Sequence, residues 1–354
     1  MMILKVEFTI ILDLVIMPLM SESRKREDLS VDDYVRGVRS DSRTILARTI
    51  TLIESNSPEH YKKAQSVLKM LYPYSGNSLR VGITGMPGSG KSTLIETLGC
   101  DLIEQGFKVA VLTVDPSSVL TRGSILGDKT RMEKLSRRKG CFIRPSPSGG
   151  TLGGVTRKSR ETILVCEAAG FDIILIETVG VGQNEITVRS MVDFFLLLLI
   201  PGAGDELQGI KRGVMEIADA LLINKAEGDH KQRALQTKHE YELALKHLAP
   251  ATRGWNTPVY TCSAQTGEGV SNIWDAINRF QQITRKNGMF DERRKNQNLD
   301  WVFALIDHYL KDNFFSHEEV QKALAKIKED VLSDSILPTA AADQLLNLFF
   351  HQKK

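Results

Sequence analysis

The sequence is poor in cysteine and carries little excess charge. Its four cysteines, in a chain of 354 residues, are widely scattered and form no Cys-x-x-Cys pair, which argues against a disulfide framework and a cysteine-based zinc site. The formal net charge is only +3, and no segment interleaves Lys and Arg with aromatic residues, so nucleic acid is not an expected partner. A reducing compartment, the cytoplasm, is the expected location.

Long hydrophobic runs are also missing. The apolar runs Ile10–Met20 and Leu196–Ile200 are both too short to cross a bilayer, and no small-residue cleavage site follows the first one. We therefore expect neither a membrane span nor a secretory signal. Two interpretations of residues 1–20 stay open. They are an upstream extension from a misplaced start, with Met17 or Met20 as the initiator, or a short packed strand or helix.

Residues 21–78 have the pattern of an N-terminal helical region. Ser30 can cap a first helix, Asp41 can open a second, and the Ser-Pro-Glu segment at 57–59 can start a third. The segment Tyr72–Gly76 then ends the helical pattern.

Residues 79–280 alternate short apolar runs with helical stretches. Near-continuous apolar runs are typical of strands buried on both faces. The predicted fold class is therefore α/β, a doubly wound and mostly parallel sheet, with an N-terminal helical extension and a C-terminal helical arm. The predicted strands are Leu79–Thr84, Val109–Val114, Phe171–Ile176, Phe194–Ile200, Ala220–Ile223 and Val259–Cys262.

Residues 281–354 form the predicted C-terminal arm. The β pattern disappears, Trp301, Leu305 and Tyr309 recur at helical spacing, and two more helical segments follow. Nothing nearby in the sequence would cover the apolar faces of these helices. They either pack back on the domain or form a subunit interface.

A phosphate-binding loop follows the first predicted strand. Its sequence matches G-x-x-x-x-G-K-[ST] and lies between a predicted strand and a predicted helix, a position that a chance glycine-rich turn rarely has. Glycines let backbone amides surround the β-phosphate, and the helix N-terminus favours its charge. Lys91 is expected to bridge the β and γ oxygens, Ser92 to bind Mg²⁺ and Thr93 to lie near the α-phosphate. The residues of the motif are Gly85, Met86, Pro87, Gly88, Ser89, Gly90, Lys91 and Ser92.

Acidic residues follow two predicted strands. Asp115 comes directly after Val109–Val114, and Glu177 after Phe171–Ile176. Ligands of a doubly wound sheet gather at the carboxyl ends of its strands, so both acids are candidates for the Mg²⁺ site, and Glu177 is the stronger one. Gly180 can then offer its N–H to the γ-phosphate. The alternative for each acid is a helix cap or a turn.

Two loops after later strands have the spacing of the guanine-recognition loops of GTPases. The first contains Asn224, Lys225 and Glu227. A carboxylate at its fourth position accepts from N1–H and the amine of guanine, which adenine cannot satisfy. The usual residue there is Asp; Glu227 keeps the chemistry but demands a small backbone shift, and Asp229 is a second candidate. The other loop contains Ser263, Ala264 and Gln265.

These motifs together resemble the MeaB/ArgK family of GTPases. The resemblance runs from about Leu29 to the C-terminus, and several of its motifs are not shared by P-loop proteins at large. The runs that carry it are Thr84–Thr93, Thr113–Ser118, Arg144–Gly154, Glu177–Gln183 and Pro201–Lys211.

The resemblance implies a homodimeric GTPase of the metallochaperone-like class. Such a protein would use GTP/GDP and Mg²⁺ and act as a chaperone for adenosylcobalamin-dependent methylmalonyl-CoA mutase, gating cofactor delivery and guarding the mutase from inactivation. Asp115, Asp128 and Glu177 match the family's Mg²⁺-linked acids, with Asp128 in the first switch. The C-terminal helices match its dimerisation arm. A third switch, which communicates with the mutase, matches Asp205, Gln208 and Lys211.

Hydrolysis is expected to be an in-line attack of water on the γ-phosphorus, with Lys91, Mg²⁺ and the loop amides spreading the charge. Gln183 either orients this water or makes a structural contact, and Lys211 is a candidate group that moves in when a partner binds.

Two rival functions are a nickel-delivery GTPase, which would require Cys/His clusters, and a metabolite kinase or transport-coupled ATPase, which would prefer ATP.

Overall fold

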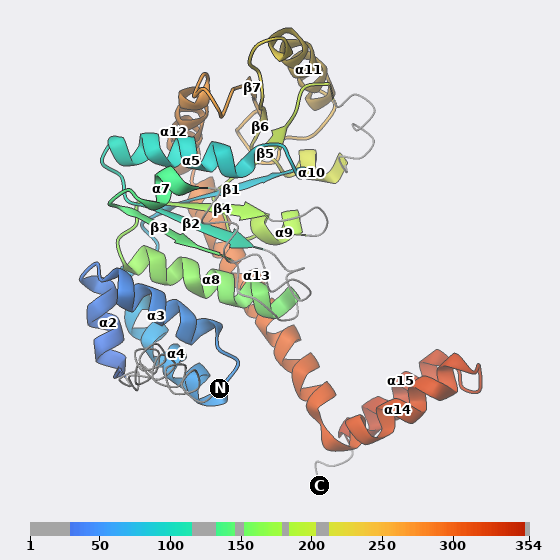
Figure 1. Cartoon of the computed structure of the whole chain (residues 1–354). Coiled ribbons are helices and arrows are strands. Elements are labelled where there is room, and N and C mark those ends of the chain that lie inside the picture. Colours follow the sequence, from blue (N-terminus) through green and yellow to red (C-terminus); the bar gives the residue numbers. More distant parts are fainter. Residues whose placement is uncertain (1–28, 115–131, 146–151, 179–183, 203–211, 351–354) are drawn as a thin grey trace, which may run out of the picture.

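The computed structural model of the chain describes residues 29–114, 132–145, 152–178, 184–202 and 212–350. Within these residues a parallel sheet is enclosed by helices, and a helical arm projects away from it (Figure 1). The apolar N-terminal run at 1–20 lies outside the described residues.

The described strands form a seven-stranded sheet in the order β3-β2-β4-β1-β5-β6-β7, and every neighbouring pair runs parallel. This confirms the predicted doubly wound sheet. β1 is central: its Ile83 is in register with Glu177 of β4, and its Gly85 with Leu198 of β5. The strands are β1 Leu79–Gly85, β2 Val109–Val114, β3 Cys141–Arg144, β4 Ile173–Thr178, β5 Phe194–Leu199, β6 Ala220–Ile223 and β7 Val259–Thr261.

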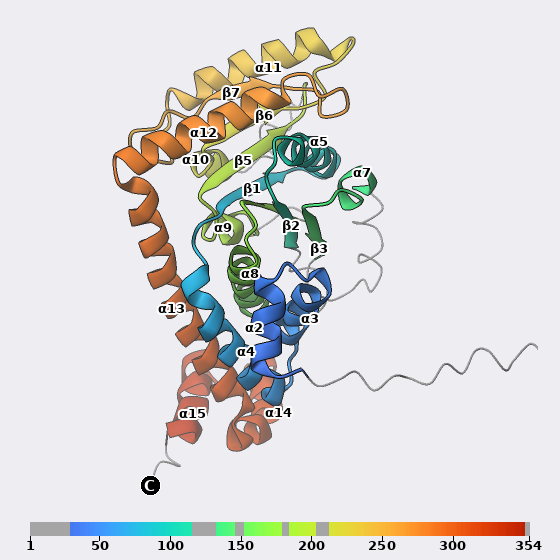
Figure 2. The same ribbon diagram turned by 90° about the vertical axis from the view of Figure 1, so that its left-hand side faces the viewer.

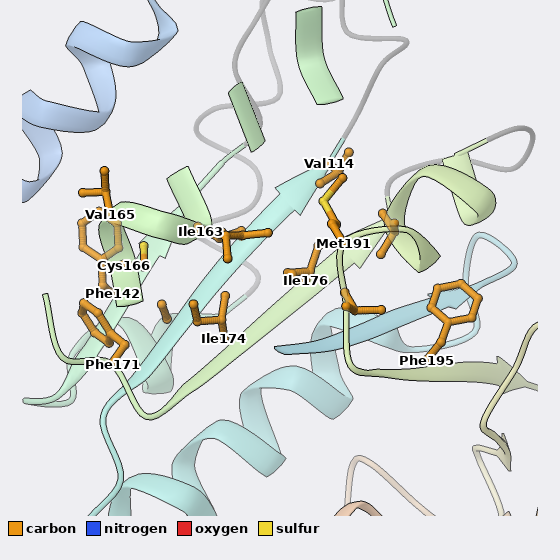
Figure 3. Packing of buried hydrophobic residues seen from close by; sticks show 14 of the residues in the cluster. Val114, Phe142, Ile163, Val165, Cys166, Phe171, Ile174, Ile176, Met191 and Phe195 are labelled. Atoms are coloured by element: carbon orange, nitrogen blue, oxygen red, sulfur yellow. The ribbon is translucent and has the colours of Figure 1, made fainter. Parts of the chain in front are cut away.

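Side chains of the central strands alternate between two buried clusters, one on each face of the sheet. In β5, Phe194 belongs to one cluster and Phe195 to the other, and the leucines that follow continue the alternation. Figure 3 shows part of the second cluster, including Ile174 and Ile176 of β4 and Phe195 of β5. Because both faces are covered, these strands need apolar residues at every position.

Helices from different parts of the chain cover the two faces (Figures 1 and 2). One face is covered by α5 Lys91–Glu104, α7 Glu133–Ser136 and α12 Val270–Lys286. The other is covered by α8 Leu152–Ala168, α9 Asn184–Arg189, α10 Arg212–Glu216 and α11 His230–Leu245.

The N-terminal helices pack on α8. The predicted cap at Ser30 is confirmed, since Ser30 and Asp33 form a reciprocal capping box at the start of the first helix. The second helix is capped by Ser42, whose Oγ accepts from the N–H of Ile45, and not by Asp41. Asp41 instead takes a φ of 61°, which places it in the turn before the helix. The elements are α2 Val31–Arg39, α3 Arg43–Glu54, α4 Pro58–Leu71 and the 3₁₀ turn η1 Tyr72–Tyr74.

The C-terminal arm begins with α13 Met289–Ser316, followed by α14 Glu318–Leu332 and α15 Pro338–Phe350. Two arginines near its start fix α13 to the amino-terminal edge of the sheet. Arg293 pairs with Asp219 at 3.3 Å, and Arg294 pairs with Asp193 at 2.7 Å. Beyond this anchor, α13 leaves the sheet, and α14 and α15 pack on each other away from it (Figure 1).

Apart from small shifts at strand ends, one strand differs from the prediction. β3, Cys141–Arg144, was not predicted because only three apolar residues precede its final arginine, and it lies at the edge of the sheet beside β2. The arginine leaves the sheet to pair with Glu54 of α3. An edge strand this short has no apolar run for periodicity to detect.

Candidate functional site

The predicted nucleotide-binding segments converge at the carboxyl ends of the central strands. The phosphate loop leaves β1, Glu177 lies at the end of the adjacent β4, and Asn224 follows β6. Parallel strands present their carboxyl ends at one edge of the sheet, which is where doubly wound proteins bind ligands. Topology therefore brings together residues that are far apart in sequence.

Glycines shape the phosphate loop. Gly85 has a φ of 150°, and a Cβ on it would lie 2.3 Å from the carbonyl oxygen of Leu198 on the neighbouring strand. Gly90 has a φ of 91° and is the N-cap of α5, where the N–H of Leu94 donates to its carbonyl at 2.9 Å. A side chain at Gly85 would collide with β5, so the turn into the loop requires glycine there.

Lys91 is held inside the loop. Its side chain is buried, and its Nζ donates to the carbonyl oxygens of Gly85 at 2.7 Å and Met86 at 3.2 Å. The buried Oγ of Ser89 has no hydrogen-bond partner in the described structure. An ammonium group and a hydroxyl group at a helix N-terminus suit a bound phosphate.

Ser92 and Glu177 form a second pair at the same edge. The hydroxyl of Ser92 donates to the two carboxylate oxygens of Glu177 at 3.1 and 3.4 Å, and Glu177 is only 6% exposed. One residue on, the hydroxyl of Thr178 donates to the Thr84 hydroxyl at 2.9 Å, which joins β4 to β1. A hydroxyl and a carboxylate are hard oxygen ligands of the kind that Mg²⁺ prefers, so this pair fits a magnesium ion.

Asn224 connects three loops. Its Nδ2 donates to the carbonyl oxygen of Ser89 at 2.8 Å, and its Oδ1 accepts from the N–H of Ala264 at 2.9 Å and from the thiol of Cys262 at 3.4 Å. The side chain is buried. In this structure Asn224 therefore serves the predicted binding site by fixing the phosphate loop against both base-recognition loops.

One carboxylate oxygen of Glu227 accepts no hydrogen bond among the described residues. This oxygen, Oε2, is buried. A buried carboxylate oxygen without a donor is costly, and the N1–H and amine of guanine would satisfy it.

Burial and the nearby Glu227 charge raise the pKa of Cys262 to about 12, so that this thiol stays protonated at neutral pH. Lys225, by contrast, is exposed with a φ of 61°.

The second base-recognition loop is tied to α5. Ser263 and Ala264 are buried, and the hydroxyl of Thr97 donates to the carbonyl oxygen of Ala264 at 2.7 Å. Gln265 is exposed. The sequence analysis missed Thr97, because it lies within α5 and belongs to none of the recognised motifs. Only its position one to two turns after Lys91 hints that it faces this loop.

Several predicted site residues lie outside the described residues, so their predicted roles stay untested. They are Asp115, Asp128, Gly180, Gln183, Asp205, Gln208 and Lys211.

In the part of the chain that the structure describes, no three His, Cys, Asp or Glu side chains gather as a metal-binding group. In the same part, no helix has the length and apolar character needed to span a bilayer.

Comparisons with known proteins agree with this site. A sequence model described as "Methylmalonyl Co-A mutase-associated GTPase MeaB" matches residues 46–319. GTPase ArgK of Escherichia coli strain K12 is 42% identical over 318 residues, 90% of this chain and 96% of its own length. The mouse "Methylmalonic aciduria type A homolog, mitochondrial" is 43% identical over 334 residues, 92% of this chain and 80% of its own.

A solved structure is similar as well. The crystal structure of a "LAO/AO transport system kinase" superposes with a TM-score of 0.73 at 36% identity, over 90% of this chain and 97% of that one. The chain therefore belongs to the MeaB family of methylmalonyl-CoA mutase-associated GTPases and is a P-loop GTP hydrolase that binds guanine nucleotides.

Proposed function

We propose that this GTPase acts as a chaperone for an adenosylcobalamin-dependent acyl-CoA mutase, most simply methylmalonyl-CoA mutase. In this role it gates cofactor delivery and protects the mutase from inactivation. The observation that carries the proposal is the match to a mutase-associated family across residues 46–319, joined to a site whose phosphate and base loops are fixed to one another. The mouse relative, named after methylmalonic aciduria, supports the same partner.

The described residues suit GTP hydrolysis. Lys91 supplies positive charge to the β and γ oxygens, and the glycine loop supplies backbone donors. Ser92 and Glu177 would hold Mg²⁺, which would neutralise charge on the phosphates. The unpartnered carboxylate oxygen of Glu227 favours guanine over adenine.

The remaining catalytic roles belong to this proposal too. Gly180 offers its N–H to the γ-phosphate, and Gln183 orients the attacking water. Asp115 and Asp128 complete the surroundings of Mg²⁺. Asp205, Gln208 and Lys211 form the loop that communicates with the mutase, and Lys211 moves in when the mutase binds.

The arm is proposed to join two copies of the chain in the cytoplasm. Beyond its anchor, α13 exposes large apolar side chains at helical spacing, among them Leu299, Val302, Phe303, Ile306 and Leu310. A contiguous apolar stripe of this length is typical of a subunit interface. Of the two alternatives that the sequence left open, the exposed stripe supports an interface for this part of the arm.

A cofactor-transfer experiment tests the proposal. Apo-mutase is mixed with adenosylcobalamin, and cofactor loading is followed by absorbance with GTP, GDP or ATP bound to this protein. The expected result is that loading depends on whether GTP or GDP is bound and that ATP has no effect. The matched control is Lys91→Ala. Loading that ignores the guanine nucleotide would contradict gating, and a preference for ATP with transfer of phosphate to a small acceptor would favour a metabolite kinase.

A further inference from the structure

Thr97 of α5 lies beside the second base-recognition loop, although it belongs to none of the nucleotide-binding motifs. It is half-buried, and its hydroxyl donates to the carbonyl oxygen of Ala264 at 2.7 Å. Its methyl group faces Gly267 of the same loop, where an added Cβ would lie 3.9 Å from Thr97 Cγ2. The hydroxyl and the methyl group of Thr97 therefore both face the loop.

Ala264 is fixed through both of its backbone polar groups. Asn224 Oδ1 accepts from its N–H at 2.9 Å, and Thr97 donates to its carbonyl oxygen. Ala264 is only 2% exposed, so water cannot readily replace either partner. The two hydrogen bonds belong to successive peptide groups, and together they set the direction of the backbone at Ala264.

The next peptide group, between Ala264 and Gln265, is oriented by Thr97. The peptide bond is trans, so its carbonyl and its N–H point in opposite directions. Because the carbonyl points to Thr97, the N–H of Gln265 points away from it. This N–H has no acceptor among the described residues, whereas the N–H groups of Ser263 and Gly267 form backbone hydrogen bonds within the loop. The N–H of Gln265 is therefore available to a ligand.

A backbone donor at this place can distinguish guanine from adenine. Guanine carries an acceptor, O6, where adenine carries an amino group, so an N–H directed at that position favours guanine. The same helix also carries the phosphate-binding lysine. Thr97 follows Lys91 by six residues, about 9 Å along α5 at 1.5 Å per residue. α5 therefore sets the separation between Lys91 and the second base-recognition loop.

We propose that Thr97 is a positioning residue for guanine recognition. It holds the Ala264 carbonyl so that the N–H of Gln265 faces O6 of the base, at a separation from Lys91 that α5 fixes. The proposal rests on the predicted assignment of residues 263–265 to the guanine base, and it is independent of the mutase partner.

Thr97→Val tests the hydroxyl, because valine keeps the branched shape and the methyl group near Gly267 and removes the donor. Affinities of the full chain for GDP and ADP are measured with Mg²⁺ by competition against a fluorescent GDP analogue. Loss of one hydrogen bond should weaken GDP binding about three- to tenfold and leave ADP binding unchanged, so the preference for GDP falls by the same factor. Thr97→Ser restores the hydroxyl and should restore the affinity for GDP.

GTP turnover gives a second measurement on the same variant. KM for GTP should rise by the same factor as the GDP dissociation constant, and kcat at saturating GTP should stay unchanged, because KM follows the dissociation constant when chemistry is slow. A residue that only stabilised the fold would not lower the preference for GDP over ADP.

Two further variants separate this role from the site on which it rests. Thr284→Val removes a hydroxyl that donates to the Phe280 carbonyl within α12 at 2.7 Å, and it should bind GDP and ADP as the wild type does. Glu227→Ala removes the carboxylate assigned to guanine and should weaken GDP binding. If Glu227→Ala weakens GDP binding and Thr97→Val does not, or if Thr97→Val weakens GDP and ADP equally, the positioning role is overturned. If neither variant changes GDP affinity, the assignment of the two loops to the base is wrong, and the role of Thr97 falls with it.

Discussion

Replacing Asn224 with alanine tests how the nucleotide site is held together. The substitution removes the donor to the Ser89 carbonyl and the acceptor for the Ala264 N–H, at 2.8 and 2.9 Å. Both partner residues are about as buried as any in the chain, with at most 2% of their surface exposed. Each group left unpaired costs about 1–3 kcal/mol, so the variant should lose about 2–6 kcal/mol in total. Part of this loss should appear in folding and part in nucleotide affinity.

Two assays separate these parts. Urea unfolding of the nucleotide-free protein measures the loss in stability, and titration with a fluorescent GDP analogue measures affinity, which we expect to fall by about 10- to 100-fold. The control is Asn272→Ala, on the exposed face of α12, which should change neither quantity. Wild-type GDP affinity and stability in Asn224→Ala would refute the view that this side chain fixes the loops.

Three further substitutions test the phosphate loop, the proposed metal site and the ion-pair cluster that anchors α13. Gly85→Ala would place a Cβ 2.3 Å from the Leu198 carbonyl and should cost about 2 kcal/mol or more in urea unfolding, whereas Gly213→Ala has open space and should be close to neutral. Glu177→Gln should raise the Mg²⁺ concentration for half-maximal GTP hydrolysis by about tenfold or more, measured by phosphate release; an unchanged requirement would remove Glu177 from the proposed metal site. Asp219→Asn removes the buried carboxylate that pairs with two half-buried arginines, Arg189 and Arg293, and should lower the free energy of unfolding by about 3–5 kcal/mol; a loss below about 1 kcal/mol would contradict a structural role for that cluster.

The central strands could be predicted from the sequence because burial on both faces leaves a strong pattern. The run Phe194–Leu199 is apolar at every position, and β5 indeed feeds both clusters. β3 could not be predicted, since an edge strand of four residues needs no such run. The helix start at Ser42 was displaced by one residue, because Asp41 and Ser42 are both good caps and only the backbone decides between them.

The candidate site likewise combines residues that a local sequence pattern predicts with contacts that depend on tertiary packing. The phosphate-loop motif predicted that Lys91 and Ser92 follow the loop at the start of a helix, where the structure has them, because the spacing of glycine and lysine within one turn is set by local geometry. The links made by Asn224 reach residues 135 and 40 positions away, and they depend on how the loops meet in space.

The central claim is that this GTPase works for a mutase, and stimulated hydrolysis tests it most directly. GTP turnover is measured by phosphate release with the protein alone and with a cognate methylmalonyl-CoA mutase, using Lys91→Ala to subtract background activity. We expect slow turnover alone and a clear increase on adding the mutase, since a partner that completes a GTPase site can accelerate hydrolysis by up to about 10⁵-fold. The same turnover with and without the mutase would contradict the account.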